Sequence, residues 1–323
     1  MKVIALVPVR NEAWVLRHTL AALSAFCDVI LVNDQNSDDR SVALCAEFPK
    51  AVVLDTIDAA RLPQRARWRL LDAARDYDGH NLLWCTDADE LPVPSAAREF
   101  VGRGGDLARG TVIDARVYNA WHSMTRYRSD WSLYGPKMRP LAFVDDRITD
   151  YPRDPNRPPL HEPRVPGEGT NPTIQVELPV IHLQWAIWNR NQMKQAWYRC
   201  IEWMDGRRSA ADINDQYSIT LPKLGIATTP VPAEWLAEMT LPPESSDDEP
   251  SWHEPEILRW FDERGAAFFE PLEIWHIGRL RAEFRRRVGR APRPDRSYRP
   301  AWPLRAQAVV RRVYHGVRRR ILP

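Results

Sequence analysis

The sequence has no long hydrophobic run. Its 323 residues include no stretch of the roughly 18 to 20 apolar residues that a helix needs to cross a bilayer. The apolar start resembles a short signal peptide, but Pro8, Arg10 and Glu12 end it at the length of a strand, and no small-residue cleavage site follows. We therefore expect a buried strand at the start of the chain. We also expect a cytoplasmic protein, with a peripheral position on the inner face of the membrane as one possibility.

Cysteines are few, and none of them forms a C-x-x-C pair. The absence of such pairs argues against a structural zinc site. Each cysteine lies in an apolar or helical context, so we expect free thiols in or near the core, as in a reducing compartment. The four are Cys27, Cys45, Cys85 and Cys200.

Glycine is absent from residues 7–12, which follow the first apolar run. A nucleotidyltransferase usually carries a phosphate-binding loop rich in glycine and lysine at this point. The sequence also has no internal repeat and no recognisable nucleic-acid-binding motif. These absences count against two alternative functions, a nucleotidyltransferase and a nucleic-acid-binding protein, and no nucleic acid partner is expected.

Acidic residues are scarce in residues 279–323. This segment has 15 arginines, no lysine and two acids, whereas the preceding residues have 30 basic and 41 acidic side chains. From Trp302 onward, apolar residues recur at helical spacing between arginines, which predicts a basic amphipathic helix suited to an anionic membrane surface. Two other interpretations stay open: the segment could bind nucleic acid phosphates, or it could be a packing helix that neutralises the acidic body.

The first part of the chain alternates between short apolar runs and amphipathic stretches. This alternation predicts an α/β fold with a mostly parallel sheet, flanked by helices and joined by right-handed crossovers. Ligands of such sheets bind at the carboxyl ends of the strands, where polar clusters surround Asp34 and Asp89. The predicted strands are residues 3–7, 29–32, 51–54 and 81–85, and the predicted helices are residues 11–24, 40–48 and 64–77.

The middle of the chain is less regular. Residues 150–179 are rich in proline and are predicted to be a loop, and so are the acidic residues 234–256. We divide the chain into two halves of one domain, residues 1–110 and 111–278, followed by the basic tail 279–323. Further strands are predicted at 111–121, 141–144 and 180–182, and a helix at 184–205.

Asp87, Asp89 and Glu90 place three carboxylates within four residues, directly after a predicted buried strand. Such carboxylates repel one another and need a counter-charge. Their hard oxygen ligands suit Mg²⁺ or Mn²⁺, and such an ion would neutralise charge on a departing diphosphate. The alternative is a solvated acidic turn that caps a helix, but the position at a strand end favours a metal site.

Four segments resemble, in the same order, the motifs of family 2 glycosyltransferases. Residues 8–12, Pro-Val-Arg-Asn-Glu, are similar to the P-x-x-N-E opening of that family, and residues 32–39 are similar to its V-D-D-G-S-x-D segment. Residues 66–74 resemble its A-R-N helix. Residues 84–90 resemble the L-D-A-D-E form of the D-x-D motif, as in the lipopolysaccharide-core glucosyltransferase branch. The resemblance implies a GT-A fold with a Rossmann-like sheet, to which the tail would add a basic helical extension.

The resemblance also implies roles for single residues of the donor half. Asp34 would accept hydrogen bonds from the base or the ribose, and Arg67 would contact the diphosphate. Asp87 would touch the ribose or the metal, and Asp89 would be the main metal ligand. The nucleotide pocket would be lined by Pro8, Val9, Arg10, Glu12 and Ala88.

Two departures from the family pattern concern the nucleoside. Asn33 replaces the first acid of the D-D pair, and Gln35 replaces the usual glycine. The base is therefore open, and we favour uridine only weakly.

The acceptor half offers weaker candidates. Inverting transfer needs a carboxylate base near the acceptor hydroxyl. Glu162 lies in a segment that resembles the H-E segment of the same branch and is the first candidate, with Asp145 and Asp146 as rivals. His182 resembles the later I-x-H and would be a third metal ligand.

Together these features predict an inverting, metal-dependent glycosyltransferase. It would move a sugar from a nucleotide-sugar donor to a hydroxyl of a glycan or lipid-linked acceptor at the cytoplasmic face of a membrane. Most of the 14 tryptophans should pack in the core, and Trp121 and Trp185 are the first candidates for stacking on a sugar.

Overall fold

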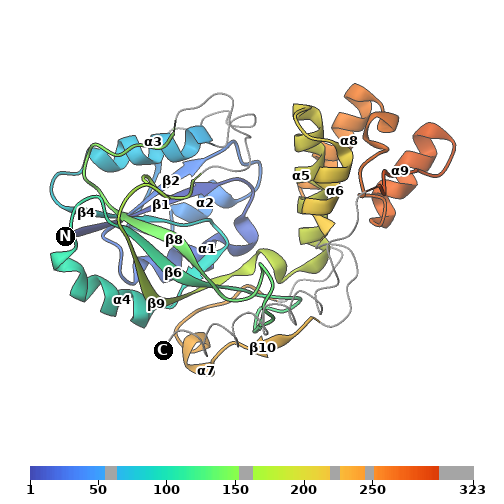
Figure 1. Cartoon of the computed structure of the whole chain (residues 1–323). Helices are drawn as coiled ribbons and strands as arrows, with labels where there is room; N and C mark the ends of the chain where they lie inside the picture. The colour runs from blue at the N-terminus through green and yellow to red at the C-terminus, as the bar shows by residue number, and fades with distance from the viewer. Residues whose placement is uncertain (55–63, 153–162, 219–225, 244–250, 298–323) are drawn as a thin grey trace, which may run out of the picture. The chain divides into compact units, whose positions relative to one another are not determined.

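The computed structural model describes residues 1–54, 64–152, 163–218, 226–243 and 251–297 (Figure 1). The chain forms two compact units, which we call the sheet unit and the helical unit. Strands on both sides of residue 110 belong to one sheet, and residues 111–278 extend over both units. The start of the basic tail at residue 279 lies inside the helical unit. The sheet unit comprises Met1–Arg128, Tyr134–Trp185 and Thr229–Glu244, and the helical unit comprises Ser129–Leu133, Ala186–Thr228 and Ser245–Pro323.

An eight-stranded sheet forms the centre of the sheet unit. It contains β1 (Lys2–Val9), β2 (Val29–Asp34), β3 (Ala51–Leu54), β4 (Asn81–Cys85), β5 (Glu90–Pro92), β6 (Val112–Asn119), β8 (Lys137–Val144) and β9 (Thr173–His182). The strand order is β3-β2-β1-β4-β8-β6-β9-β5. The pairs β1–β2, β1–β4, β2–β3 and β6–β9 are parallel, whereas β4–β8, β6–β8 and β5–β9 are antiparallel. The predicted α/β architecture is confirmed.

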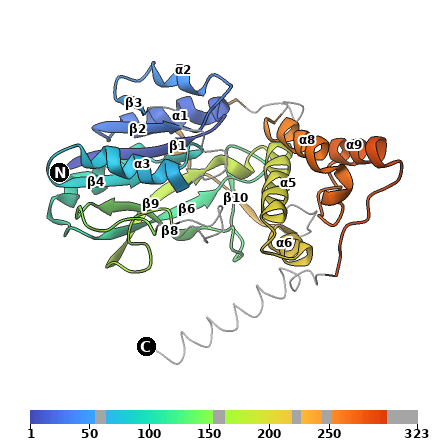
Figure 2. The ribbon, with the colours of Figure 1, turned by 90° about the horizontal axis from the view of Figure 1, so that it is seen from above.

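Helices cover both faces of this sheet (Figure 2). α1 (Ala13–Ser24) buries Leu20 and Leu23 against one face, and α3 (Gln64–Arg75) buries Leu70 and Leu71 against the other. Each fully buried side chain of this kind stabilises the fold by about 1.5–3 kcal/mol. α4 (Pro94–Arg103) and the short 3₁₀ turn η1 (Gly104–Asp106), which the sequence did not indicate, follow β5.

The alternating first part of the chain follows its prediction closely. The four predicted strands and the helices that start near residues 11 and 64 are all present. The helix predicted at residues 40–48 is shorter, since α2 (Ser41–Cys45) ends in a turn in which Glu47 and Phe48 donate to the carbonyls of Leu44 and Cys45.

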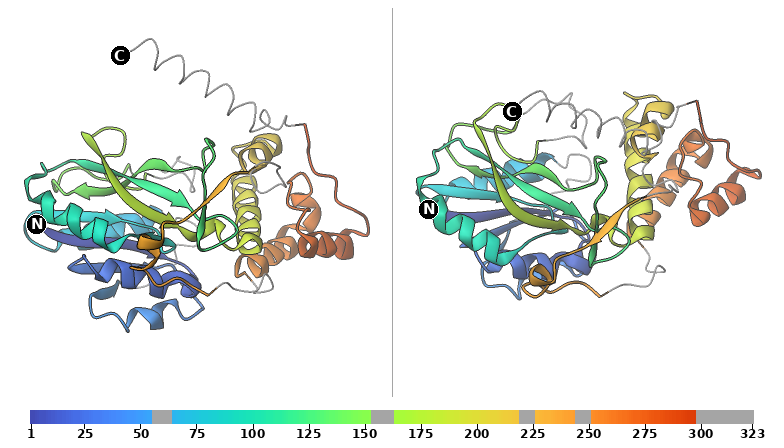
Figure 3. Two further views of the ribbon diagram at one scale, coloured as in Figure 1. Left: turned by 90° about the horizontal axis from the view of Figure 1, so that it is seen from below. Right: turned by 60° about the horizontal axis from the view of Figure 1, so that its bottom comes forward.

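The prediction of a loop up to residue 179 was wrong, because β9 begins at Thr173 and runs beside β6 (Figure 3). The first five residues of β9 alternate between exposed and half-buried, so this half lacks the continuous apolar run of a buried strand. The register between β6 and β9 shifts after Ala115: Ala115 pairs with Val176, but the next residue, Arg116, pairs with Pro179. An irregularity of this kind accommodates a proline within a sheet.

The helical unit has a core of its own, in which Phe261, Phe269, Trp275 and Phe284 pack together. The predicted helix at 184–205 begins later, because residues 183–185 form the 3₁₀ turn η2 (Leu183–Trp185). The loop predicted at 234–256 instead contains α7 (Ala233–Leu236), which belongs to the sheet unit, and the start of α8. The helices of the helical unit are α5 (Trp188–Asp205), α6 (Ala210–Gln216), α8 (His253–Arg264), η4 (Ala266–Phe269) and α9 (Gly278–Val288).

The described part of the basic tail is largely ion-paired within the helical unit. The helix predicted from Trp302 lies outside the described residues, and within those residues no helix is long and apolar enough to cross a membrane. The paired arginines support the interpretation of a packing helix for this part of the tail. The pairs are Arg279–Glu254, Arg286–Glu283, Arg287–Asp262, Arg290–Glu270 and Arg296–Glu273.

Candidate active site

Two polar loops meet at one edge of the sheet. The parallel register pairs Val9 with Asp34 and Leu6 with Cys85, so β1, β2 and β4 end at the same edge. Asp34 is the last residue of β2, directly before the loop that follows this strand, and the turn after β4 contains the three acids. We call residues Thr86–Glu90 the acidic turn. As the sequence predicted, both clusters lie at carboxyl ends of parallel strands.

The loop after β2 is tied to the loop after β1. Asp34 is buried and its carboxylate accepts a hydrogen bond from the Ser37 N–H at 3.1 Å. The Asn11 N–H donates to Ser37 Oγ at 2.9 Å, and the Asp38 N–H donates to Asn11 Oδ1 at 2.9 Å. Asn11 and Asn36 both have positive φ, a conformation that asparagine tolerates better than most residues. These bonds fix the carboxylate of Asp34 in place.

Asn33 faces away from this network. It is fully buried, and neither its Oδ1 nor its Nδ2 has a hydrogen-bond partner. An unpaired buried amide costs about 1–3 kcal/mol. The side chain that departs from the family pattern is thus also an unsatisfied polar group.

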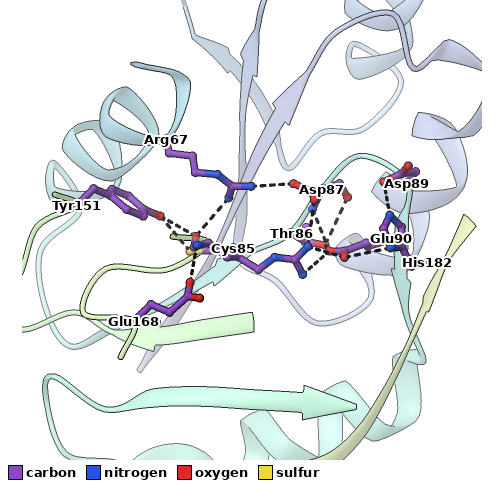
Figure 4. Close-up of polar contacts among 10 residues, drawn as sticks. Arg67, Cys85, Thr86, Asp87, Asp89, Glu90, Tyr151, Glu168 and His182 are labelled. Carbon is purple, nitrogen blue, oxygen red and sulfur yellow. Dashed lines mark hydrogen bonds and ion pairs between the residues drawn. The ribbon is translucent and has the colours of Figure 1, made fainter. Parts of the chain in front are cut away.

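Two arginines hold the acidic turn (Figure 4). Arg67, on α3, donates through Nη2 to Asp87 Oδ1 at 2.9 Å. Arg164 donates through Nη2 to Asp87 Oδ2 at 3.0 Å and to Glu90 Oε1 at 2.6 Å, and through Nη1 to Glu90 Oε2 at 2.9 Å. Both oxygens of Asp87 therefore face a guanidinium group, which does not favour Asp87 as a metal ligand.

Arg164 did not emerge from the sequence, where it lies in the proline-rich stretch. Its N–H donates to Glu168 Oε2 at 2.6 Å, and its carbonyl accepts from the Tyr151 hydroxyl at 3.0 Å and from Arg67 Nη1 at 3.2 Å. The neighbouring Val165 is fully buried in the core beside α3. No motif or spacing marked Arg164, because its partners lie far away in the sequence.

The charges of this cluster act on one another. Burial alone would raise the pKa of Asp87, but the guanidinium groups of Arg164 and Arg67 outweigh burial and hold this pKa below its usual range. Burial would lower the pKa of Arg67, but the charge of Asp87 outweighs burial and the pKa is raised. The side chain of Arg139, on β8, is exposed at the surface, but neighbouring groups partly desolvate its guanidinium group. This desolvation and the charge of Arg164 lower the pKa of Arg139, while Glu90 opposes them. The edge of the sheet thus combines three acids with three arginines.

Asp89 and His182 face each other at the end of this cluster (Figure 4). Asp89 Oδ1 lies 3.3 Å from His182 Nε2. Strand pairing explains the approach, because Glu90 on β5 is the partner of His182 on β9, and the Leu183 N–H donates to the Asp89 carbonyl at 2.8 Å. Burial lowers the pKa of His182, but Asp89 more than offsets this effect and the pKa is raised.

A hydrogen bond from α1 also holds the acidic turn. The Thr19 hydroxyl on α1 donates to the Ala88 carbonyl at 2.6 Å. Within the part of the chain that the structure describes, no group of three or more His, Cys, Asp or Glu side chains is arranged to hold a metal ion. Asp89 and His182 form a pair of possible ligands rather than a complete cage.

Asp145 and Asp146 lie at the opposite edge of the sheet. β8 runs antiparallel to β4, and the Asp145 N–H donates to the Asn81 carbonyl at the start of β4. Asp145 binds Arg75 at 3.0 Å, and Asp146 binds the Thr149 hydroxyl at 2.6 Å. Because β8 ends far from the acidic turn, this placement removes both residues as candidates for the catalytic base.

The remaining predicted residues divide into three groups. Glu162 lies outside the described residues. Trp121 and Trp185 are buried and stack on each other, with ring centroids 5.1 Å apart and an interplanar angle of 16°, so they belong to the core rather than to a sugar-binding surface. Pro8, Val9, Arg10 and Glu12 lie at the end of β1 and in the loop that follows it, at the edge that carries Asp34.

The sheet unit is an α/β unit that carries acids and arginines at the carboxyl ends of its parallel strands. This arrangement is typical of the class of proteins that bind nucleotides or phosphates at this edge of the sheet. Residues 4–161, slightly less than half of the chain, match the family model described as Glycosyl transferase family 2. The protein is accordingly a glycosyltransferase. No curated protein matches the chain.

Several solved structures are partly similar to the chain. S. aureus TarS residues 1–349 show 10% identity and a TM-score of 0.39, over 87% of this chain and 83% of that one. A glucosyl-3-phosphoglycerate synthase from Mycobacterium tuberculosis, solved with Mn²⁺, UDP and glucosyl-3-phosphoglycerate, shows 18% identity and a TM-score of 0.28, over 36% and 44%. Mannosyl-3-phosphoglycerate synthase from Rubrobacter xylanophilus shows 24% identity and a TM-score of 0.26, over 38% and 41%. The chain thus spans less than half of each of the last two proteins.

Proposed function

We propose that the protein is an inverting, metal-dependent glycosyltransferase that moves a sugar from a nucleotide-sugar, with a UDP-sugar weakly favoured, to a hydroxyl of a glycan or lipid-linked acceptor. The observation that carries this proposal is the acidic turn, where Asp89 faces His182 beside a pair of arginines. Such a site can bind a diphosphate through a metal and through guanidinium groups at once.

Asp89 and His182 would hold the Mg²⁺ or Mn²⁺ ion. Two cis ligands of an octahedral ion at about 2.1 Å lie about 3 Å apart, and the observed separation of 3.3 Å between Oδ1 and Nε2 fits this requirement. With two protein ligands, the other coordination positions are left for phosphate oxygens and water. The ion would stabilise the negative charge of the leaving diphosphate.

The donor itself would be bound by three other elements. Arg67 and the exposed Arg139 would contact the diphosphate, since both lie beside the acidic turn. The fixed carboxylate of Asp34 would bind the nucleoside, and residues at the end of β1 would line its pocket. Glu162, which is close in sequence to Arg164, is the proposed base that takes the proton of the acceptor hydroxyl.

The basic tail would bring the enzyme to its acceptor at the cytoplasmic face of a membrane. Arg281 and Arg285 on α9 are exposed, and residues 298–323 add seven more arginines. Each arginine near an anionic lipid surface contributes about 1 kcal/mol, so the tail can supply a reversible attachment.

Thermal unfolding with nucleoside diphosphates and their sugars, each with and without MnCl₂, tests the donor site. At a hundredfold excess over Kd a ligand stabilises by about 2.7 kcal/mol, and we expect such a shift only with metal. Asp89→Asn should lose it, whereas Asp78→Asn, at an exposed acid before β4, should keep it. If no nucleotide raises the melting temperature of the wild type, or if Asp89→Asn responds as the wild type does, the proposal is wrong.

A further inference from the structure

Glu90 is the centre of the polar contacts in the acidic turn. Its side chain is fully buried. Besides two bonds from Arg164, Glu90 Oε2 accepts from the Thr86 hydroxyl at 3.2 Å and from the Asp87 N–H at 3.1 Å. Glu90 Oε1 lies 3.9 Å from His182 Nδ1. One carboxylate therefore links the start of the turn, its end and the strand that carries His182.

Arg164 supplies the counter-charge that this carboxylate requires. An ionised carboxylate without water or a partner is strongly destabilising, and removal of one partner from a buried ion pair costs about 3–5 kcal/mol. The contact is bidentate, with donor–acceptor distances of 2.6 Å and 2.9 Å, a geometry that a guanidinium group can make and an ammonium group cannot. Arg164 thus fixes the orientation of Glu90 as well as its charge.

The backbone of Arg164 is fixed before any ligand binds. Its N–H and its carbonyl are both hydrogen-bonded, to Glu168 and to Tyr151 with Arg67. Its side chain is mostly buried, with 16% exposed. Little conformational entropy remains to be lost at this position when the site fills.

We propose that Arg164 is a positioning residue for metal binding: through its ion pair with Glu90 it holds the acidic turn so that Asp89 and His182 face each other. This role rests on the proposed function, because it assigns the pair Asp89–His182 to the metal. Arg164 acts through Glu90, whose backbone pairs with His182, and through Asp87, and it need not touch the donor.

The alternative is that Arg164 leaves the turn and binds phosphate itself. The two roles predict different effects on Mn²⁺ binding when the charge of Glu90 is removed together with Arg164. If Arg164 positions the turn, neutralising Glu90 together with Arg164 removes the unpaired buried charge and restores much of the site. If Arg164 binds phosphate directly, the second substitution restores nothing.

The test uses Arg164→Met, Arg164→Lys and the double variant Arg164→Met/Glu90→Gln in the full chain. Arg116, which is half-buried, and the exposed Glu177 form a control pair on the same sheet and outside the site, with Nε 2.6 Å from Oε2. Mn²⁺ binding is measured by electron paramagnetic resonance with and without UDP, and UDP binding is measured by calorimetry with Mn²⁺ or with EDTA. Circular dichroism reports whether each variant folds.

We expect Arg164→Met to weaken Mn²⁺ binding about 10- to 100-fold, as for loss of other residues that orient metal ligands. Arg164→Lys should recover little, the double variant should bind Mn²⁺ more tightly than Arg164→Met and regain most of the loss, and the Arg116→Met and Arg116→Met/Glu177→Gln controls should match the wild type. If Arg164→Met does not fold, the double variant alone decides, and near-normal Mn²⁺ binding by it supports the proposal.

Four results would overturn the proposal. The first three are normal Mn²⁺ binding by Arg164→Met, a double variant that folds but binds Mn²⁺ no better than the single variant, and equal losses of UDP affinity with Mn²⁺ and with EDTA. The fourth is a wild type that binds no Mn²⁺ under either condition. Mn²⁺ binding that depends on Arg164 but occurs without any nucleotide binding would support this role while contradicting the proposed function.

Discussion

Arg67 on α3 and Asp87 in the acidic turn form an ion pair, with Nη2 of the arginine 2.9 Å from Oδ1 of the aspartate. The arginine side chain is 18% exposed and the aspartate side chain is 35% exposed, so a ligand at the sheet edge can reach both. A phosphate at this edge would compete with Asp87 for the guanidinium group.

Arg67→Met should weaken UDP binding in the presence of Mn²⁺ by about 10- to 100-fold, because a hydrogen bond to a charged group is worth about 1.5–3 kcal/mol. Uridine, which has no phosphate, should bind the variant and the wild type equally. Calorimetry measures both ligands, and Arg103→Met, at an arginine that is 79% exposed, is the control. An equal loss for uridine would place Arg67 at the nucleoside instead.

Asp34→Asn should weaken UDP and uridine binding to the same extent, by about tenfold, since the loss of one charge-assisted hydrogen bond affects only the nucleoside. Asp38→Asn changes an exposed acid of the same loop and should leave both affinities unchanged. If Asp34→Asn impairs UDP alone, its carboxylate acts on the phosphates or on the metal.

Trp121→Ala should destabilise the fold by about 3–5 kcal/mol, as expected for loss of a buried aromatic side chain, because Trp121 stacks on Trp185 and lies beneath the guanidinium group of Arg128, 4.5 Å from its ring. Urea unfolding measures the change. A stable variant with weakened sugar binding would instead support the original expectation of a sugar-stacking role.

His276 makes the helical unit sensitive to acid. Burial lowers its pKa from 6.5 to about 4, and the charge of Arg199 adds to this effect. Between these values the unfolded chain binds a proton that the folded chain does not, so stability should fall as the pH drops from 6.5 towards 4. Denaturation at pH 7 and pH 5 should show a smaller decrease for His276→Gln than for the wild type. An identical decrease would contradict the assignment.

Deletion of residues 298–323 should weaken binding to vesicles of phosphatidylcholine with phosphatidylglycerol, because seven arginines are lost. Binding of the full chain should also weaken at high NaCl concentration. The shift in melting temperature with nucleotide should persist in the truncated protein. Unchanged vesicle binding would show that the tail neutralises the protein instead of docking it.

The placement of Asp34 and Asp89 at one edge of the sheet could be predicted because its signals are local. Asp34 and Asp89 each follow an apolar strand, and parallel strands bring their carboxyl ends to one edge. The antiparallel direction of β8 has no such signal, which is why Asp145 was placed among the candidates although it lies at the opposite edge. Arg164 was missed for a related reason. Its ion-pair partner Glu90 lies 74 positions away in the sequence, and such a contact produces no periodic pattern of residues.

Cys85, Cys27, Cys45 and Cys200 are free and buried, as the sequence predicted. Burial raises the pKa of Cys85 to about 11, so the thiol next to the acidic turn stays protonated and unreactive near neutral pH. The prediction succeeded because burial of a thiol depends mainly on its apolar neighbours, which the sequence shows directly.

The candidate site is built from three segments that are distant in the sequence: the acidic turn, Arg164 and His182. This has a consequence for the order of folding. The acidic turn follows β4, but Arg164 and His182 reach it only after the antiparallel strands have joined the sheet. Contacts between residues so distant in sequence form slowly. During synthesis, the emerging chain should therefore gain a stable nucleotide-binding edge only after β9 has left the ribosome, and nascent chains that end before Thr173 should not be protected from proteolysis by UDP with Mn²⁺.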